Sequence, residues 1–96
     1  MQLNSQAFLY LGNGEIVPVS PENKKSFTLK ELKGFVTGHI EILTLSDGRI
    51  MILDGEGKLK NSPINNLATS LATDVLRSGD YIVGDVLVTP YALVDY

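Results

Sequence analysis

Short β-prone runs separated by turn signals dominate the hydrophobic pattern of the chain. The first two runs are Ala7–Leu11 and Glu15–Val19, and they flank Gly12-Asn13-Gly14. Asn-Gly favours a tight hairpin because both residues tolerate positive φ, and a two-residue turn at this pair would place Leu11 opposite Ile16. The alternative is a looser loop bounded by the two glycines. The pattern therefore predicts an antiparallel pair near the amino terminus.

A short amphipathic helix is expected next. Thr28 and Glu31 have the spacing of a capping box, and Phe27 before the cap can pack onto Leu32 as a hydrophobic staple. Gly38 is the expected stop, because glycine commonly ends a helix in the left-handed conformation. The predicted apolar stripe of this helix comprises Leu29, Leu32, Phe35 and Val36.

The clearest hairpin pattern lies in the middle of the chain. His39–Leu45 and Arg49–Asp54 surround a turn signal, Asp47-Gly48. A two-residue turn at this pair would place Leu45 opposite Ile50. Both faces of the hairpin would then be largely apolar, whereas a half-exposed antiparallel hairpin alternates. The pair is expected either in the middle of a sheet covered on both sides or against another subunit.

Two further expectations concern the sheet as a whole. Pro18 cannot donate to a β-ladder, so its strand is predicted to lie at an edge or to pair on one side. A chain of 96 residues has few elements with which to cover both faces of the central hairpin. We therefore expect a homo-oligomer, most simply a homodimer.

A second helix and a final strand complete the pattern. Ser62 suits an N-cap and Pro63 the first helical position. After the helix, Tyr81–Thr89 reads as a strand interrupted by Gly84, and residues 91–96 as a last strand or an arm. The predicted apolar stripe of the helix comprises Ile64, Leu67, Ala68, Leu71, Ala72, Val75 and Leu76. From this phase, Leu67 is expected to be a core residue whose truncation opens a cavity.

These elements predict an α+β fold in one domain, residues 1–96, with the order β-β-α-β-β-α-β and a mostly antiparallel sheet built from hairpins. The composition agrees, with 44% hydrophobic and 20% charged residues. No cysteine and a single histidine exclude a disulfide framework, a thiolate nucleophile and a multi-histidine metal centre within one chain. No apolar run approaches the ~20 residues of a membrane span, so a cytoplasmic protein without membrane contact is expected. A net charge of −3 argues against nucleic-acid binding.

Catalytic motifs are missing from the sequence, so we expect a protein that is not an enzyme. His39 reads as a surface or capping histidine, although a general base is the alternative. Glu41 and Asp54 face each other in the expected register, and two facing carboxylates can bind Mg²⁺ or share a proton. The alternative is a solvated pair at the end of the ladder. No metal or cofactor is predicted.

A small-molecule site, if present, is expected around the start of the second helix. Free N–H groups at a helix start, together with a nearby ammonium, favour a phosphate-bearing ligand, and amides can read a base or a ribose hydroxyl. The alternative is that these residues are caps and solvated lysines. A glycine within a strand is the second candidate, since it allows close approach to the backbone, the alternative being a packing bulge. The candidate ligand-binding residues are Lys58, Lys60, Asn61, Ser62, Asn65, Asn66, Thr69, Gly84 and Asp85.

Several phrases of the sequence resemble a family of uncharacterised domains found in small proteins of phages, prophages and conjugative elements, including those of gut Bacteroidales. The resemblance spans residues 27–90 and is carried by Gly38–Ile42, Asp47–Met51, Gly57–Asn65, Leu67–Thr69 and Tyr81–Val88. It implies a mobile-element origin and a setting in the host cytoplasm, and it supplies no activity or ligand. Ala72–Ser78 departs from the pattern and is expected to lengthen the helix.

Three classes of function follow as hypotheses. The first is a non-enzymatic accessory factor that blunts host defence, either by sequestering a small anionic nucleotide or by binding a host protein. A protein-binding version predicts exposed apolar surface, for which the central hairpin, Tyr81, Tyr91 and Tyr96 are candidates. The second is a small metal-dependent hydrolase or nuclease that uses Glu41 and Asp54. The third is a passive structural protein.

Overall fold

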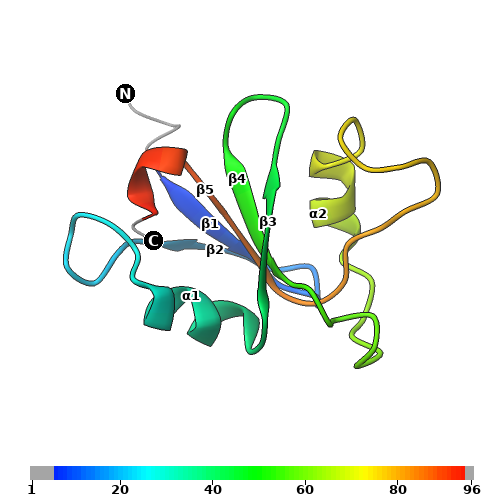
Figure 1. Cartoon of the computed structure of the whole chain (residues 1–96), viewed down its shortest axis with the longest axis horizontal. Helices are drawn as coiled ribbons and strands as arrows, with labels where there is room; N and C mark the ends of the chain where they lie inside the picture. Colours follow the sequence, from blue (N-terminus) through cyan, green and yellow to red (C-terminus); the bar gives the residue numbers. More distant parts are fainter. Residues whose placement is uncertain (1–5, 95–96) are drawn as a thin grey trace.

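Residues 6–94 are described by the computed structural model and form an α+β fold (Figure 1). A five-stranded antiparallel sheet has the strand order β2-β1-β5-β4-β3. The fold class and the predicted order of strands and helices are confirmed. The elements are β1 Ala7–Tyr10, β2 Ile16–Val19, α1 Leu29–Val36, β3 Ile40–Thr44, β4 Ile50–Asp54, α2 Asn66–Leu71, β5 Val86–Thr89 and the 3₁₀ helix η2 Tyr91–Leu93.

Two hydrophobic cores lie on opposite faces of the sheet. On the α1 face, Ile52 of β4 and Leu87 of β5 pack with Leu32 of α1. On the α2 face, Met51 of β4 packs with Ala68 of α2. The two-sided apolar character predicted for the central hairpin is confirmed for β4, which is buried between two strands and two helices of its own chain. The argument that a second subunit is needed to cover it is therefore wrong, and β3 is an edge strand.

Both hairpins have a pairing register one residue away from the predicted one. Tyr10 pairs with Ile16, not with Val17, and Leu43 pairs with Met51, not with Ile52. The reason is loop length, because each turn has three residues and ends in a glycine with positive φ. The N–H of Gly14 (φ 98°) donates to Leu11 O at 2.9 Å, and that of Gly48 (φ 91°) donates to Leu45 O at 3.0 Å. Three-residue loops of this kind carry a bulge at the glycine, and the bulge sets the register.

Helix α1 has the predicted start and a different end. The N–H of Glu31 donates to Thr28 Oγ1 at 3.2 Å and the N–H of Thr28 donates to Glu31 Oε1 at 2.9 Å, which confirms the capping box. Leu29 does not belong to the buried stripe, because it is 41% exposed. The helix ends on Thr37 (φ 56°), which takes the left-handed conformation expected of Gly38.

Helix α2 starts later and ends earlier than predicted. Its N-cap is Asn65, not Ser62, since the chain before it is extended and Ile64 bridges to Val83. It has six residues and ends at Leu71, so the lengthened helix expected from the resemblance is also wrong. The start is delayed because Pro63 O accepts from the N–H of Gly84 at 2.8 Å, which holds this segment beside the entry to β5.

Residues 91–93 form a 3₁₀ helix rather than a strand. The predicted strand is shortened to β5, because Gly84 adopts a positive φ of 75°. After β5 the chain forms η2, and Leu93 O then accepts from the N–H of Phe27 at 2.6 Å. The expectation for residues 95 and 96 lies outside the described residues. In the described part of the chain, no helix is long and apolar enough to cross a membrane.

Candidate functional site

Asn65, one of the predicted ligand-binding residues, is a structural residue. The residue is only 2% exposed. Its Nδ2 donates to Tyr10 O at 2.9 Å and to Gly84 O at 2.8 Å. Its Oδ1 accepts from the N–H of Ala68 at 3.1 Å, which caps α2. These bonds tie α2 to β1 and to the entry of β5. They occupy both donor hydrogens of the amide, so Asn65 has no donor left for a ligand.

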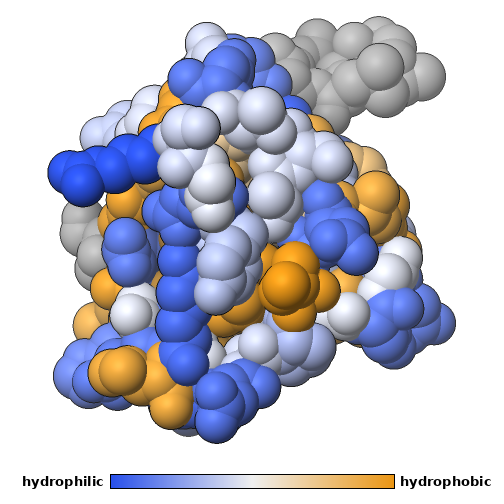
Figure 2. All heavy atoms as spheres, turned by 90° about the vertical axis from the view of Figure 1, so that its right-hand side faces the viewer, coloured by the Kyte–Doolittle hydropathy of each residue, from blue (hydrophilic) through white to orange (hydrophobic). Residues whose placement is uncertain are grey.

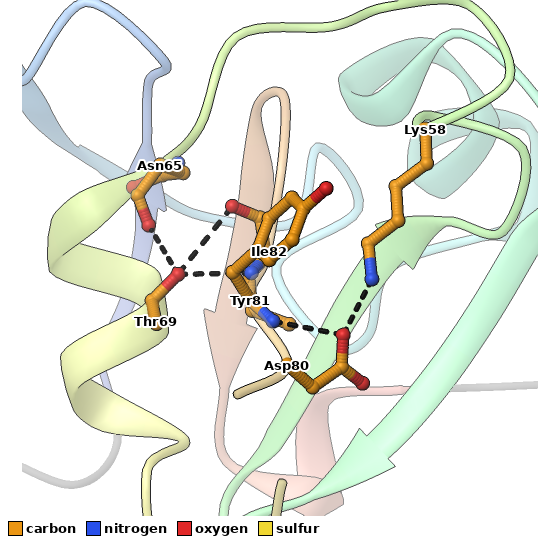
Figure 3. A network of polar contacts seen from close by, with 6 residues as sticks. All are labelled: Lys58, Asn65, Thr69, Asp80, Tyr81 and Ile82. Atoms are coloured by element: carbon orange, nitrogen blue, oxygen red, sulfur yellow. Dashed lines mark hydrogen bonds and ion pairs between the residues drawn. The ribbon is translucent and has the colours of Figure 1, made fainter. Parts of the chain in front are cut away.

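Thr69 has a similar structural role on the next turn of α2 (Figure 3). Its hydroxyl donates to Asn65 O at 2.8 Å and accepts from the N–H of Ile82 at 2.9 Å. Thr69 and Asn65 therefore hold the segment that precedes β5 against α2. The sequence predicted ligand contacts for these two residues, and in the structure their hydrogen bonds place a loop.

Lys58 is engaged by an acidic neighbour and an aromatic ring (Figure 3). Its Nζ forms an ion pair with Asp80 Oδ1 and lies 4.3 Å from the centroid of the Tyr81 ring. The hydrogen bond from Lys58 lowers the pKa of Asp80, and the same bond raises the pKa of Lys58. The Tyr81 N–H also donates to Asp80, at 2.8 Å. Lys58 thus secures the loop at Asp80 and is not available as a lone cation for a phosphate.

Lys60 is also paired. Its Nζ donates to Asp54 Oδ2 at 2.8 Å and to Thr37 O at 3.2 Å. Asp54 is 9% exposed and accepts a further bond from the N–H of Glu56 at 2.9 Å. Burial acts to raise the pKa of Asp54, but the hydrogen bonds from Lys60 and Glu56 outweigh it and the pKa is lowered. This carboxylate therefore stays ionised and joins the end of β4 to the following loop.

The Asp54–Lys60 pair explains Gly38. A Cβ at this position would lie 2.8 Å from Asp54 Cγ and 2.7 Å from Lys60 Nζ. Real carbon atoms do not approach so closely, so the glycine makes room for the ion pair beside the end of α1. The sequence predicted that Gly38 ends the helix, but Thr37 takes that role.

Four of the predicted residues do come together around one hollow, which we call the loop pocket. It has a volume of about 180 Å³. Its lining residues are Val36, Thr37, Asp54, Lys60, Ser62, Pro63, Gly84 and Asp85. Asp85 is already engaged, since its Oδ1 accepts from the N–H of Gly12 at 2.8 Å. Two carboxylates against one ammonium make this lining net negative, which disfavours a phosphate.

Asn61 and Asn66 lie outside the loop pocket. Both are exposed, and Asn61 has a left-handed φ of 58° in the turn before Ser62. Asn66 is the first residue of α2, and a helix of six residues provides a weak dipole for an anion. The predicted cluster around a helix start is therefore dispersed by the late start of α2.

A second hollow, which the sequence did not indicate, lies beside β3 and is called the edge pocket. It has a volume of about 150 Å³, and its lining combines apolar side chains with three carboxylates and one ammonium. Its lining residues are Glu41, Leu43, Leu53, Asp54, Gly55, Lys58, Leu76, Asp80, Tyr81, Ile82 and Val83. The actual register places Glu41 and Leu43 on the α2 face of the sheet, and a register one residue away could not reveal that neighbourhood.

A third and wider hollow, of about 410 Å³, follows the turn after α2. Thr69 is the one predicted site residue in its lining, and that side chain is already committed to the backbone of Ile82. This hollow is bordered by Arg77–Asp80 and brings no set of reactive groups together.

The carboxylate pair proposed for metal chemistry is not formed in the predicted way. Glu41 pairs with Leu53 across the ladder, and Asp54 pairs with Ile40, so the two acids are not cross-strand partners. The side chain of His39 is exposed, with Nε2 3.8 Å from Glu56 Oε1. Among residues 6–94, no group of three or more metal-ligating acids and histidines is present.

Comparison with known proteins places the chain in a family. No curated protein and no solved structure matches the sequence. One family model matches residues 9–92, and so covers β2 to β5, both α-helices, the second half of β1 and the linings of the loop pocket and the edge pocket. This span confirms the part of the resemblance that pointed to an uncharacterised family. The chain therefore belongs to the family described as a domain of unknown function, DUF3846.

Proposed function

We propose that this protein is a non-enzymatic accessory protein of a phage or other mobile element, and that it acts in the bacterial cytoplasm by binding a protein of the host, as a counter-defence factor. The observation that carries the protein-binding part is the edge pocket beside the edge strand β3. The mobile-element part rests on the resemblance of Gly57–Asn65 and Tyr81–Val88 to proteins of such elements.

The pairing of both lysines favours a protein partner over a nucleotide. Lys58 is held by Asp80 and Lys60 by Asp54, so each ammonium named for a phosphate already has a carboxylate. The loop pocket is small as well as negative: small-molecule sites usually measure roughly 300–1,000 Å³, against about 180 Å³ here. A nucleotide would have to displace an existing ion pair, whereas a protein partner would not.

The shape of the surface favours an anchored contact over a broad apolar interface. On the face that carries α2, Figure 2 shows hydrophobic areas separated by hydrophilic residues. Tyr81 and Tyr91 do not join into one patch, because Tyr81 adjoins the α2-side core through Ile82 and η2 adjoins the α1-side core through Leu93. Tyr96 lies outside the described residues. A pocket that takes one side chain suits such a surface better than a flat patch.

Self-association remains a prediction with a changed basis. Since the chain covers both faces of β4 itself, a homo-oligomer would form through another surface of the molecule. Light scattering at micromolar concentration measures the oligomeric state directly.

Affinity capture from bacterial lysate, with mass spectrometry of retained proteins and small molecules, tests the proposed function. We expect a host protein to be retained and titration calorimetry with cyclic and linear nucleotides to show no heat of binding. Retention of a nucleotide that is lost in both Lys58→Ala and Lys60→Ala would overturn the proposal. Asp74→Asn, an exposed change in the turn after α2, serves as the matched control.

A further inference from the structure

The outward-facing backbone groups of β3 can be assigned from its two ends. The N–H of Leu45 donates to Arg49 O at 2.8 Å, and the N–H of Gly55 donates to His39 O at 2.8 Å. Bonded and outward-facing residues alternate along an antiparallel strand. The odd-numbered residues of β3 therefore bond to β4, and Ile40, Ile42 and Thr44 direct their N–H and C=O groups away from the sheet.

This edge lacks two of the devices that commonly block pairing. Natural edge strands are often protected by proline or lysine, and β3, Ile-Glu-Ile-Leu-Thr, contains neither. Ile42 is 39% exposed on the α1 face, beside an outward N–H. In the described part of the chain β3 has one partner strand, so its other side presents a template for an added strand.

The edge pocket adjoins the same strand on the α2 face. Glu41 and Leu43 of β3 form one wall, and Leu53 and Ile82 contribute apolar surface. A volume of about 150 Å³ is the size of a single side chain: cavities of roughly 150 Å³ accept a benzene-sized group. A residue of an added strand that points to the α2 face would thus meet a cavity of matching size.

The charges of the lining select the chemistry of that residue. Glu41 and Asp80 flank Lys58, and both carboxylates contribute to raising the pKa of Lys58. In residues 6–94 Glu41 has no ion-pair partner within salt-bridge distance, whereas Lys58 is taken by Asp80. The carboxylate of Glu41 can therefore pair with a cation of a partner. Arginine and lysine combine an aliphatic stem with a cationic head, which suits a pocket lined by Leu43, Leu53 and Glu41.

We propose that β3 pairs with an extended segment of a partner protein and that a lysine or arginine of this segment enters the edge pocket. The inference rests on the proposed protein-binding function and names its site. Alternate residues of the segment point to opposite faces. The neighbours of the basic residue then lie on the α1 face near Ile42, where apolar β-branched side chains pack best. The partner motif is a basic residue between two apolar ones in an extended conformation.

A synthetic peptide with this pattern tests the proposal on the full chain. The probe is acetyl-Ser-Thr-Val-Arg-Val-Thr-Ser-amide, and its matched control has Glu in place of Arg. NMR titration of the ¹⁵N-labelled protein is expected to shift the amides of Ile40, Ile42 and Thr44. We expect the Arg peptide to bind about tenfold more tightly than the Glu peptide. Equal affinity of the two peptides, or shifts confined to other strands, would contradict the proposal.

Two protein variants separate the edge from the pocket. Ile42→Pro removes an outward N–H without removing a ladder bond, and it should abolish binding of the Arg peptide. Ile42→Lys provides a second blocked edge if the proline variant fails to fold. Glu41→Gln should lower the affinity for the Arg peptide about tenfold and leave the affinity for the Glu peptide unchanged or higher. Asp74→Asn should change neither affinity.

Lysate capture distinguishes failure of the site from failure of the proposed function. A host protein retained equally by the wild-type chain, Ile42→Pro and Glu41→Gln would overturn the site and leave protein binding standing. A wild-type chain that retains no protein would overturn both. A dimer that Ile42→Pro converts to monomer would show that a second copy occupies the edge, which also overturns the basic-segment proposal.

Discussion

At one edge of the sheet Pro18 occupies an outward-facing position of β2, and at the other edge Ile42 occupies the corresponding position of β3. Leu11 N–H donates to Glu15 O, so the odd-numbered residues of β2 bond to β1 and Pro18 faces away from the sheet. The missing N–H of Pro18 therefore costs no ladder bond. The β2 edge is closed to an added strand at no expense to the fold, whereas β3, which could be closed in the same way, presents a free N–H.

Exposed apolar surface does not distinguish the two edges. Ile16 and Val17 of β2 are exposed to a degree similar to that of Ile42 in β3. The difference lies in the backbone and in the pocket that adjoins β3. We infer that hydrogen-bonding geometry and charge, rather than apolar area, distinguish a binding edge from a protected one in this fold.

The largest expected effect separates the edges from the centre of the sheet. Ile52 and Ile42 are cross-strand partners, but Ile52 is fully buried. Ile52→Ala should lower the free energy of unfolding by about 2–5 kcal/mol, because it leaves a cavity in the α1-side core. Ile42→Ala should lower it by less than about 1 kcal/mol, since the edge side chain is partly solvated. Urea denaturation measures both, and equal losses would show that β3 is not an edge.

The second effect concerns the ion pair at the end of β4, next to the start of β3. Lys60→Met should lower the free energy of unfolding by about 1–3 kcal/mol, because Asp54 keeps its charge in a largely buried position. The pKa of Asp54 is lowered on folding, so the contribution of the pair is complete above the unfolded pKa of about 3.9 and is lost as pH falls through the folded value. Denaturation from pH 7 to pH 2 should show the variant and wild-type curves converging under acid.

Asp54→Asn is the control for this ion pair. It should lose the acid-dependent part of the stability that the wild type shows, since no carboxylate remains to be protonated at this position. A Lys60→Met loss that stays constant down to pH 2 would mean that the lysine acts through its hydrogen bond to Thr37 O rather than through the pair with Asp54.

The strands and α1 were predictable because their signals are local. The capping box of Thr28 and Glu31, and the apolar runs of β3 and β4, depend on neighbours within a few residues. The register was not predictable in the same way, because Asn-Gly and Asp-Gly fit both a two-residue turn and the last positions of a three-residue loop. A loop one residue longer than predicted changes which side chains are cross-strand partners and share a face of the sheet.

The candidate site was less predictable for a related reason. The start of α2 depends on a bridge between Ile64 and Val83. The role of Gly38 depends on the ion pair that Asp54 forms with Lys60. Each is a contact between segments distant in sequence. Local rules identified Gly38, Asn65 and Gly84 as unusual, and the tertiary structure determined what each one does.

The third prediction opens the closed edge. Pro18→Thr should restore an outward N–H to β2 and make this edge a template for pairing. Stability should fall by about 0.4–1 kcal/mol through the greater freedom of the unfolded chain. Self-association should increase with concentration, measured by light scattering between micromolar and millimolar protein. A variant that self-associates no more than the wild type would indicate that Pro18 does not protect the edge.

The smallest effect tests whether the surface of α2 competes with the open edge. Leu67 was expected in the core, and it is 42% exposed on the outer side of a helix whose buried residue is Ala68. Leu67→Ala should therefore change the free energy of unfolding by no more than about 0.5 kcal/mol, the range of ordinary surface substitutions. It should also leave the affinity for the Arg peptide unchanged, because Leu67 does not line the edge pocket. A loss of peptide affinity without a loss of stability would extend the binding surface from β3 across α2, and the contrast between the two edges would then account for only part of it.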